Sequence, residues 1–371
     1  MKRLVLVGAG HAHALVLAEL ARNKPKDLEV VLVSPHRLAP YSGMIPGWLA
    51  GHYHWDECCV DFERLCRRAR VAMCIDSVAA LDPDRQELQL QNGDTLGFDL
   101  LSLNVGSTLM PPSSDGTMVM PMRPLGELRW RWEELQRVVT ALEPGTNFRV
   151  LTVGGGAAGV ESMLAVSHSL RQLAPGVLFQ FVLTMEGGDI LPNMAKGTAS
   201  RLRQHLVRQG IETVSHFRAT QVWQGSVLDQ TGKSIPADAV LWATGAQAYP
   251  WIRASGISVD AGGFVSVDSS LRSLSHQRIF AAGDCAGLTP PLPKAGVFSV
   301  RMGPILAHNL LADIGGQALQ SYIAQRRYLA LLGTGGKNAV ASWGAYAWQG
   351  QWVWHWKQAV DRRFVALFGS D

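Results

Sequence analysis

The chain has 371 residues, of which 47% are hydrophobic and 17% charged, so it can bury the core of one large domain or of two. Its net charge of +4 comes from scattered Lys and Arg, which excludes a typical nucleic-acid binder, and its 38 glycines follow no period, which excludes a collagen-like chain. The five cysteines contain no C-x-x-C pair with zinc spacing and indicate a reducing compartment such as the cytoplasm. No apolar run reaches the roughly 18 uninterrupted residues of a membrane-spanning helix.

The chain begins with the pattern of a strand, a glycine turn and a helix. "RLVLV" at 3–7 is a β-rich run that ends in glycine, the Ala- and Leu-rich stretch 11–22 predicts a helix, and "LEVVLVS" at 28–34 predicts a second buried strand. This order within about 30 residues is the unit of a doubly wound nucleotide-binding fold. Further strands are predicted at 70–76 and within 86–106, with a hairpin turn at Asn92-Gly93.

The first glycine turn departs from the dinucleotide fingerprint at one position. Gly8 and Gly10 match G-x-G-x-x-G, but His13 stands in place of the third glycine. Three interpretations are open: a cofactor loop with one altered packing residue, a His-x-His metal site formed with His11, or a glycine turn with core histidines and no ligand. Alternate residues on a tight turn do not readily converge on one ion, and no third ligand lies nearby in sequence, which favours the cofactor loop.

The same pattern restarts about 150 residues later, with strand, turn and helix at 148–173 and a second strand at 178–186. Here Gly154, Gly156 and Gly159 form a complete G-x-G-x-x-G. The first glycine permits the tight turn, the second lets the backbone approach a pyrophosphate, and the third lets helix and strand pack closely. The free N–H groups at the helix N-terminus favour phosphate. Two loops in the correct frame therefore predict two bound dinucleotides.

The residues that end the second strand of each unit bear on the choice of coenzyme. The first unit ends in Ser34-Pro35 without an acid, so a hydroxyl or backbone contact must replace the usual ribose-binding carboxylate. The second unit ends in Met185-Glu186, and Glu186 is the candidate ribose ligand. The choice between NAD and NADP stays open, with a preference for NAD because no arginine replaces the acid.

Two further strands that end at glycine are predicted at 238–245 and 278–286, before a proline-rich loop at 288–296 and a helix through residue 313. The last part of the chain, 342–368, is rich in aromatic residues. Its apolar stripe recurs every four residues and consists of Trp352, Trp356, Val360, Phe364 and Phe368, widened by Ala359 and Leu367. The basic residues Lys357, Arg362 and Arg363 lie off this stripe. Such a helix suits a membrane surface, the protein's own sheet or a second subunit.

With its two glycine loops, "ATG" at 243–245 and "AAGDCA" at 281–286, the chain resembles the pyridine nucleotide–disulfide oxidoreductase superfamily, near type II NADH dehydrogenases and sulfide:quinone oxidoreductases. The resemblance covers roughly residues 1–310. A closer likeness is to the flavoprotein module fused ahead of selenide, water dikinase in some bacteria, and it lies in segments 34–53, 104–107, 293–304 and 356–368. Those proteins share the G-x-G-H-x-H start, so His13 looks like a trait of that subgroup.

The resemblance implies an α/β fold with two Rossmann-like dinucleotide-binding domains. FAD would be bound by 1–115 with 245–313 and NAD(P)H by 116–244, followed by a C-terminal element at 314–371. The FAD ligands it implies are Gly8, Gly10, His11, His13, Ser34, Arg37, Val78, Gly106, Gly283, Asp284, Lys294 and Ala295, with Asp284 on the ribityl chain. The NAD(P)H ligands it implies are Gly154, Gly156, Gly159, Glu161, Glu186 and Gly245.

Missing thiols narrow the expected chemistry. Disulfide reductases carry a C-x-x-x-x-C pair in front of the flavin, where this chain has "YSGMIPG" at 41–47. Sulfide:quinone enzymes need two separated cysteines late in the chain, where this sequence offers Cys285 alone. The resemblance therefore implies hydride transfer from NAD(P)H to FAD and on to a quinone or another small acceptor, with no metal. The candidate catalytic residues are Lys294, which would stabilise the reduced flavin together with the following helix N-terminus, and Ser42, Met44 and Pro46 on the acceptor face.

Rival expectations remain at this point. One is a flavin-bound partner or regulatory subunit of selenide, water dikinase, and others are a sulfur- or selenium-species oxidoreductase and a thiol–disulfide enzyme that uses Cys285. A cytoplasmic protein is expected, with peripheral contact to the inner face of the membrane if the C-terminal helix lies on lipid.

Overall fold

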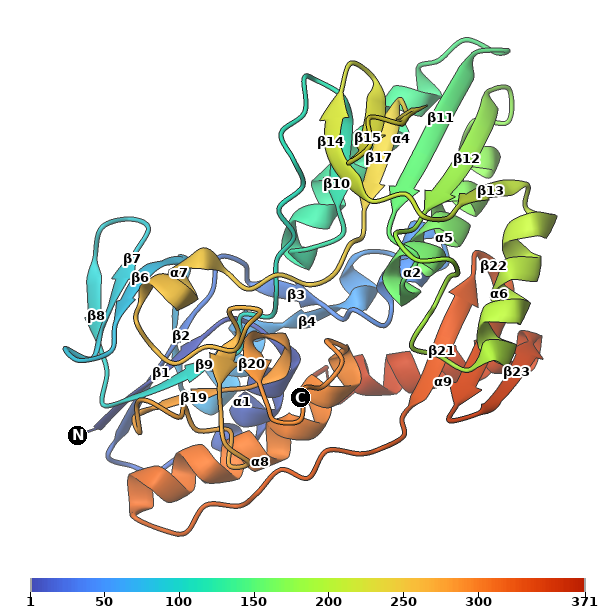
Figure 1. Cartoon of the computed structure of the whole chain (residues 1–371). Helices are drawn as coiled ribbons and strands as arrows, with labels where there is room; N and C mark the ends of the chain where they lie inside the picture. The colour runs from blue at the N-terminus through green and yellow to red at the C-terminus, as the bar shows by residue number, and fades with distance from the viewer. Residues whose placement is uncertain (1, 370–371) are drawn as a thin grey trace.

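A computed structural model describes residues 2–369 and contains two five-stranded parallel sheets at opposite ends of the molecule (Figure 1). Residues 1, 370 and 371 of the expected domain ranges lie outside the described part. The strands of the first sheet, in spatial order, are β19 (Ile279–Ala281), β9 (Leu100–Leu103), β1 (Lys2–Val7), β2 (Leu28–Val33) and β5 (Ala72–Cys74). The α/β class with parallel Rossmann-like sheets is thereby confirmed.

Alternating side chains of β1 face two different layers. Leu4 and Leu6 pack under the helices α1 (His11–Asn23), α3 (Phe62–Ala69) and α8 (Gly296–Gly315). Val5 and Val7 pack against the antiparallel sheet of β6 (Val78–Asp82), β7 (Glu87–Leu90) and β8 (Thr95–Gly97). Because both faces are covered, the strand is apolar at every one of these positions, as parallel strands usually are. The predicted hairpin turn lies between β7 and β8, with Gly93 at φ +93°.

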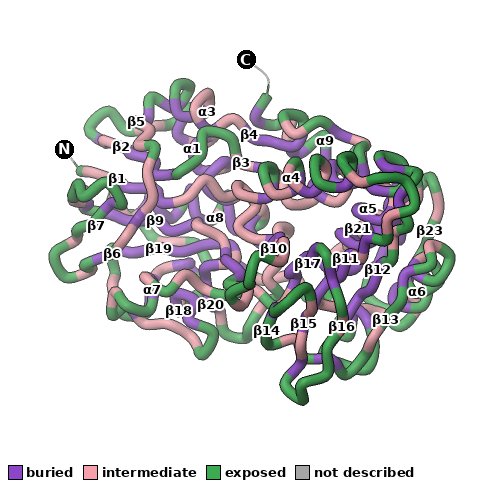
Figure 2. Tube along the Cα trace, turned by 90° about the horizontal axis from the view of Figure 1, so that it is seen from above, coloured by how far each residue is buried: buried purple, intermediate pink, exposed green. Residues whose placement is uncertain are grey.

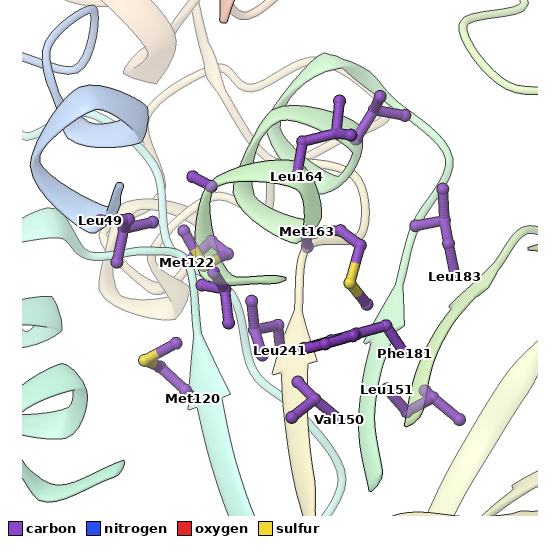
Figure 3. Close-up of a cluster of buried hydrophobic side chains, with 14 of the residues drawn as sticks. Leu49, Met120, Met122, Val150, Leu151, Met163, Leu164, Phe181, Leu183 and Leu241 are labelled. Atoms are coloured by element: carbon purple, nitrogen blue, oxygen red, sulfur yellow. The ribbon is translucent and has the colours of Figure 1, made fainter. Parts of the chain in front are cut away.

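Four strands of the second sheet repeat the order of the first, but its edge strand precedes the other four in the chain, whereas the edge strand of the first sheet follows them. Its strands, in spatial order, are β10 (Met118–Pro121), β17 (Ala239–Trp242), β11 (Asn147–Val153), β12 (Leu178–Thr184) and β13 (Ile211–Val214). The helices of this unit are α4 (Leu128–Thr140), α5 (Ala157–Leu173) and α6 (Lys196–Arg208), and β14 (Ala219–Trp223), β15 (Ser226–Asp229) and β16 (Ser234–Pro236) form a small added sheet. Figure 3 shows Met163 of α5 above Phe181 and Leu241 of the strands, in the largest apolar core. Figure 2 shows that the central strands of both sheets are largely buried.

Short elements complete the two units and the segments between them. They are β3 (Leu38–Pro40), α2 (Ile45–Leu49), η1 (Asp56–Cys58), β4 (Cys59–Asp61), η2 (Leu125–Glu127), α7 (Pro250–Ala254), β18 (Val265–Ser266), η3 (Gly283–Cys285) and β20 (Ala286–Gly287). Within the described range, no helix combines the length and the apolar character needed to cross a membrane.

The C-terminal element is an antiparallel sheet of β21 (Leu329–Thr334), β22 (Gly336–Trp343) and β23 (Tyr346–Gly350), followed by α9 (Gln351–Ala366). The sheet contacts α6, and α9 runs from it back toward α1 (Figure 1). The predicted stripe does not stay on one face, since a four-residue step advances an α-helix by 400° and the stripe turns by roughly 160° from Trp352 to Phe368. Trp352 is therefore exposed, whereas Phe364 and Phe368 are buried against the first unit.

Candidate functional site

A cavity of about 770 Å³ lies between the two sheets, at the carboxyl ends of their strands. This edge is where open parallel sheets bind ligands, and the volume lies in the range of small-molecule and cofactor sites. The sequence-predicted residues that line it are Gly8, Gly10, His11, Ser34, Ser42, Pro46, Val78, Gly106, Glu161, Asp284, Lys294 and Ala295. Met44, expected beside Ser42, is buried in the core behind it.

The other predicted residues do not line the cavity. Arg37 is exposed and its guanidinium lies 3.5 Å from the carboxylate of Glu63, while Glu186 is exposed and lies 3.7 Å from Arg218. His13 and Gly283 are buried behind the cavity wall. The remaining predicted residues outside the lining are Gly154 and Gly156 in the turn after β11, Gly159 in the first turn of α5, and Gly245 after β17.

The first glycine turn is closely packed around His13, which occupies the position of the third fingerprint glycine. Gly8 has φ +96°, and a Cβ there would lie 2.6 Å from the carbonyl oxygen of Asn104. The imidazole of His13 bridges the turn: Nδ1 lies 2.7 Å from the carbonyl oxygen of Gly8 and Nε2 2.9 Å from Oγ of Ser102. Because a carbonyl accepts only, Nδ1 carries the proton and Ser102 donates to Nε2. Burial lowers the pKa of His13 to about 4, so this ring is a neutral packing group with both nitrogens occupied, which does not support a metal pair with His11.

His11 lies on the cavity side of the same turn. Its ring makes edge-to-face contacts with Tyr41 and Phe364, at centroid distances of 5.2 and 5.5 Å. Burial lowers the pKa of His11 to about 4, so the imidazole is uncharged at neutral pH. Phe364 belongs to α9, which means that the C-terminal helix helps to hold the first turn in place.

The second turn has the geometry that its complete fingerprint predicts. Gly154 has φ +124°, and a Cβ there would lie 2.2 Å from the carbonyl oxygen of Ala243. A Cβ at Gly159 would lie 1.9 Å from the carbonyl oxygen of Gly154, so helix and strand approach too closely for any side chain. No described residue accepts the N–H groups of Ala157, Ala158 and Gly159, the first three of α5. These are the donors that a pyrophosphate takes at a helix N-terminus.

Asp284 is paired inside the cavity by a residue that the sequence analysis missed. Arg123 donates to Oδ2 of Asp284 and to Oγ of Ser107, and Ser107 also donates to Oδ2 over 3.1 Å. Arg123 stands between the two units in a segment without a motif, so no sequence pattern marks it. It supplies the positive charge nearest to Asp284 and reaches the carbonyl oxygen of Lys294 at 3.4 Å.

Lys294 lines the cavity with its ammonium group already engaged. Nζ donates to the carbonyl oxygen of Ala286 at 2.7 Å and lies 3.8 Å from the centroid of the Phe264 ring. Burial lowers the pKa of Lys294. The following helix α8 begins at Gly296, and Gly296 faces the cavity. The helix end therefore faces the cavity and the ammonium donates one hydrogen bond to backbone, while its role toward the flavin stays a prediction.

A buried charge cluster lies beside the cavity and was also missed. Lys357, expected on the polar side of α9, is buried: Nζ lies 2.8 Å from Oδ2 of Asp361 and donates to the carbonyl oxygen of Gly43 at 2.5 Å. Burial opposes the ammonium, but Asp361 and Glu161 outweigh it and raise the pKa of Lys357. The sequence signal was present as an i,i+4 pair on the face of α9 that also carries Phe364.

Glu161 is the acid of this cluster that reaches the cavity. Its Oε1 accepts the N–H of Gly333 at 2.7 Å, from β21 of the C-terminal sheet. Burial raises the pKa of Glu161 to about 7, against the opposing charge of Lys357. The carboxyl can therefore hold or release a proton close to neutral pH.

The cysteines have the character of core residues. All five are free, and four of them are buried. Burial raises the pKa of the Cys58 and Cys59 thiols to about 12 and that of Cys285 to about 11. A thiolate at these positions is disfavoured, which argues against the thiol–disulfide alternative.

The residues present fit two dinucleotides. Both turns bring backbone so close to backbone that a Cβ would fill the space, and the helix N-termini that follow them face the cavity through His11 and Ala157. Bare turns with unused N–H groups are suited to pyrophosphate, and the cavity wall between them is suited to a planar ring system.

Comparisons with known proteins agree with this geometry. The NADH dehydrogenase-like protein YutJ of Bacillus subtilis (strain 168) is 22% identical over 346 residues, which cover 91% of this chain and 91% of that protein. The structure of NDH2 from Plasmodium falciparum in complex with NADH has a TM-score of 0.83 at 13% identity and covers 99% of this chain and 97% of its own. For the sulfide:quinone oxidoreductase of Aquifex aeolicus the TM-score is 0.80 at 15% identity, covering 99% and 91%.

The solved structures establish the fold, and the family follows from the sequence match. The family model described as pyridine nucleotide-disulphide oxidoreductase matches residues 2–309, which includes both glycine turns and the segment that ends in Asp284. The chain belongs to the pyridine nucleotide-disulphide oxidoreductase family.

Proposed function

We propose that the protein is an FAD-dependent oxidoreductase that takes a hydride from NAD(P)H and passes the electrons to a quinone or another small acceptor. The observation that carries this proposal is that the first glycine turn and the helix N-terminus after the second one, at Ala157 and Ala158, line one cavity. We assign FAD to residues 1–115 and 245–313 and NAD(P)H to residues 116–244. When bound, FAD supplies the hydride acceptor and releases the electrons to the second substrate.

In this assignment the side chains of the cavity orient the cofactors, offer charge to them or hold a proton. Arg123 and Ser107 orient Asp284, the expected partner of the ribityl chain. The N-terminus of α8 at Gly296 offers a partial positive charge to the flavin ring, and Ser42 and Pro46 line the wall beside it. Glu161 holds a proton near neutral pH at the side of the cavity that α5 forms, where the nicotinamide is expected.

The acceptor is inferred from the balance of the reaction and from the relatives. Oxidation of NAD(P)H gives two electrons and one proton, so reduction of a quinone to a quinol consumes one further proton. Glu161 lines the same cavity, and its pKa of about 7 lets it exchange that proton at neutral pH. The Haemophilus influenzae relative is named as a type II NADH:quinone oxidoreductase, which supports a quinone here.

The decisive experiment is anaerobic addition of NADH, and separately NADPH, to the purified yellow protein. We expect the flavin absorption to bleach within seconds with at least one of them and to return when a quinone is added. Bleaching by NADH in preference to NADPH is expected if Glu186 receives the ribose. A yellow protein that neither coenzyme bleaches would contradict the proposal and favour the rival, a flavin-bound partner of selenide, water dikinase. If a sulfur or selenium species restored the flavin absorption and a quinone did not, the acceptor would be that species and not a quinone.

We further propose that the exposed side of α9 rests on a membrane surface, where quinones dissolve. Trp352, Trp356 and Val360 are exposed there, next to the basic side chains of Arg362 and Arg363. Aromatic and basic residues in this combination are typical of helices that lie in the lipid headgroup region. The same helix carries Lys357 and Phe364 beside the cavity, so a lipid-bound quinone would meet the protein close to the flavin.

The Trp352→Ser, Trp356→Ser double variant is expected to bind vesicles of mixed anionic and neutral lipid at least about tenfold more weakly than the unmodified protein. Both side chains are exposed, so the fold is expected to stay intact. Sedimentation with vesicles measures the effect, and Trp130→Ser, at an exposed tryptophan on α4, is the matched control. Equal binding by the double variant and the control would show that α9 does not contact lipid.

A further inference from the structure

Asn104, the residue directly after β9, connects three segments of the cavity wall. Its Oδ1 accepts the N–H groups of Ala12 at 3.0 Å and His13 at 3.2 Å. Its Nδ2 donates to the carbonyl oxygen of Ala282 at 2.6 Å, two residues before Asp284. One buried amide thus holds the start of α1, the end of β9 and the approach to the carboxylate expected on the ribityl chain.

Two glycines leave the room that this side chain occupies. A Cβ on Gly10 would lie 2.1 Å from Oδ1 of Asn104, and a Cβ on Gly283 would lie 2.7 Å from its Nδ2. The second fingerprint glycine is therefore required by Asn104 as well as by the approach of a pyrophosphate.

The second turn has the same backbone frame without the amide. Ala243 follows β17 as Asn104 follows β9, and its carbonyl oxygen crowds Gly154 just as that of Asn104 crowds Gly8. Alanine cannot reach the helix N-terminus, and among the described residues nothing lies within 4 Å of a Cβ built on Gly156. The first three N–H groups of α5 consequently remain without a side-chain acceptor in the described structure.

We propose that Asn104 is a positioning residue that fixes the first turn in its ligand-binding form. As a result, the first turn would hold its dinucleotide longer than the second turn holds its own. This inference rests on the proposed function, in which the first turn holds FAD as a resident group and the second holds NAD(P)H, which must exchange at each turnover. Asn104 occupies the N–H groups of Ala12 and His13, both fully buried, and leaves the cavity-lining backbone of Gly10 and His11 for the pyrophosphate.

The physical reason is preorganisation. A turn whose helix amides and neighbouring segments are already held by one side chain loses little conformational freedom when the dinucleotide binds. The second turn has no such side chain, so the amides at the start of its helix are held by the ligand alone, and we expect it to release the ligand more easily. The neutral imidazole of His13 supports the same arrangement from behind, through the carbonyl oxygen of Gly8 and Oγ of Ser102.

The test is the rate at which FAD leaves the protein. For Asn104→Ala we expect the dissociation rate constant of FAD to rise at least about tenfold, while the dissociation constant of NAD(P)H, measured on the FAD-loaded protein, stays within about twofold. The two phosphorus NMR signals of bound FAD are expected to shift as well, since they report the surroundings of the pyrophosphate. Asn104→Asp keeps the acceptor for Ala12 and His13 but cannot donate to Ala282, so we expect an intermediate rate.

Asn309→Ala is the matched control for a purely structural role. Asn309 is fully buried in the same unit and likewise ties separate segments, donating to the carbonyl oxygens of Ser270 and Gln320, away from the cavity. We expect it to lower stability without changing the release of FAD. The proposal is overturned if FAD leaves Asn104→Ala, or Asn104→Asp should the alanine variant not fold, no faster than it leaves this control. A parent protein that binds FAD and is bleached by NAD(P)H would then leave the proposed function standing, whereas one that takes up no FAD would refute that function first.

Discussion

The substitution Lys357→Met is expected to lower the free energy of unfolding by about 3–5 kcal/mol, the usual cost of removing one partner from a buried ion pair. Lys357 and Asp361 are both buried, and Nζ of Lys357 donates a hydrogen bond to Oδ2 of Asp361 over 2.8 Å. Methionine fills a similar volume but leaves the carboxylate of Asp361 and the carbonyl oxygen of Gly43 without this donor. Denaturant unfolding at neutral pH, with FAD bound, measures the loss.

Two further variants separate charge from packing. Replacing both partners, Lys357→Met with Asp361→Leu, is expected to restore most of the stability, because two apolar side chains of similar size need no pairing. Arg362→Ala is the matched control on the same helix: Arg362 is exposed and lies 3.9 Å from Glu57, so its loss is expected to cost less than about 1 kcal/mol. If Lys357→Met lowered the free energy of unfolding no more than Arg362→Ala does, the buried ion pair would not be what stabilises α9 in its place beside the cavity.

The parts of the fold that depend on local pattern were predicted from the sequence. Strand, glycine turn and helix recur around Gly8 and Gly154 within short stretches, and the structure has β1-α1-β2 and β11-α5-β12 there. Fold class, family and the FAD and NAD(P)H cofactors of that family were confirmed in consequence. A turn of this kind is determined by a few neighbouring residues, so it can be recognised without knowledge of the remaining chain.

The residues that complete the cavity depend instead on contacts between distant segments. Arg123 reaches Asp284 across 161 positions, Lys357 reaches Gly43 across 314, and Asn104 reaches Ala12 across 92. Apart from the i,i+4 spacing of Lys357 and Asp361, nothing in the local sequence distinguishes these side chains from solvated ones. The apolar stripe of α9 failed for a related reason, since a period of four residues differs from the helical period and carries the stripe from solvent into the core.

Replacement of one glycine in the second turn is expected to weaken the binding of NAD(P)H and to leave the binding of FAD unchanged. For Gly154→Ala we expect the affinity for NAD(P)H to fall roughly a hundredfold, which corresponds to about 3 kcal/mol. Gly154 has φ +124°, which is strained for any L side chain, and its Cβ would lie 2.2 Å from the carbonyl oxygen of Ala243. The turn must shift, and the N–H groups at the start of α5 then no longer converge on a pyrophosphate. The dependence of the flavin bleaching rate on coenzyme concentration measures this loss.

The content of bound FAD is expected to stay at the level of the parent protein, because the first turn and Asn104 belong to the other sheet. Gly145→Ala is the control within the same unit: Gly145 has φ +85°, but among the described residues nothing lies within 4 Å of its Cβ. It is expected to cost about 1–2 kcal/mol of stability through backbone strain alone and to leave coenzyme affinity unchanged. If Gly154→Ala weakened coenzyme binding no more than Gly145→Ala, the second turn would not be where the pyrophosphate binds. Equal loss of FAD and NAD(P)H would mean that the two turns do not bind separate dinucleotides.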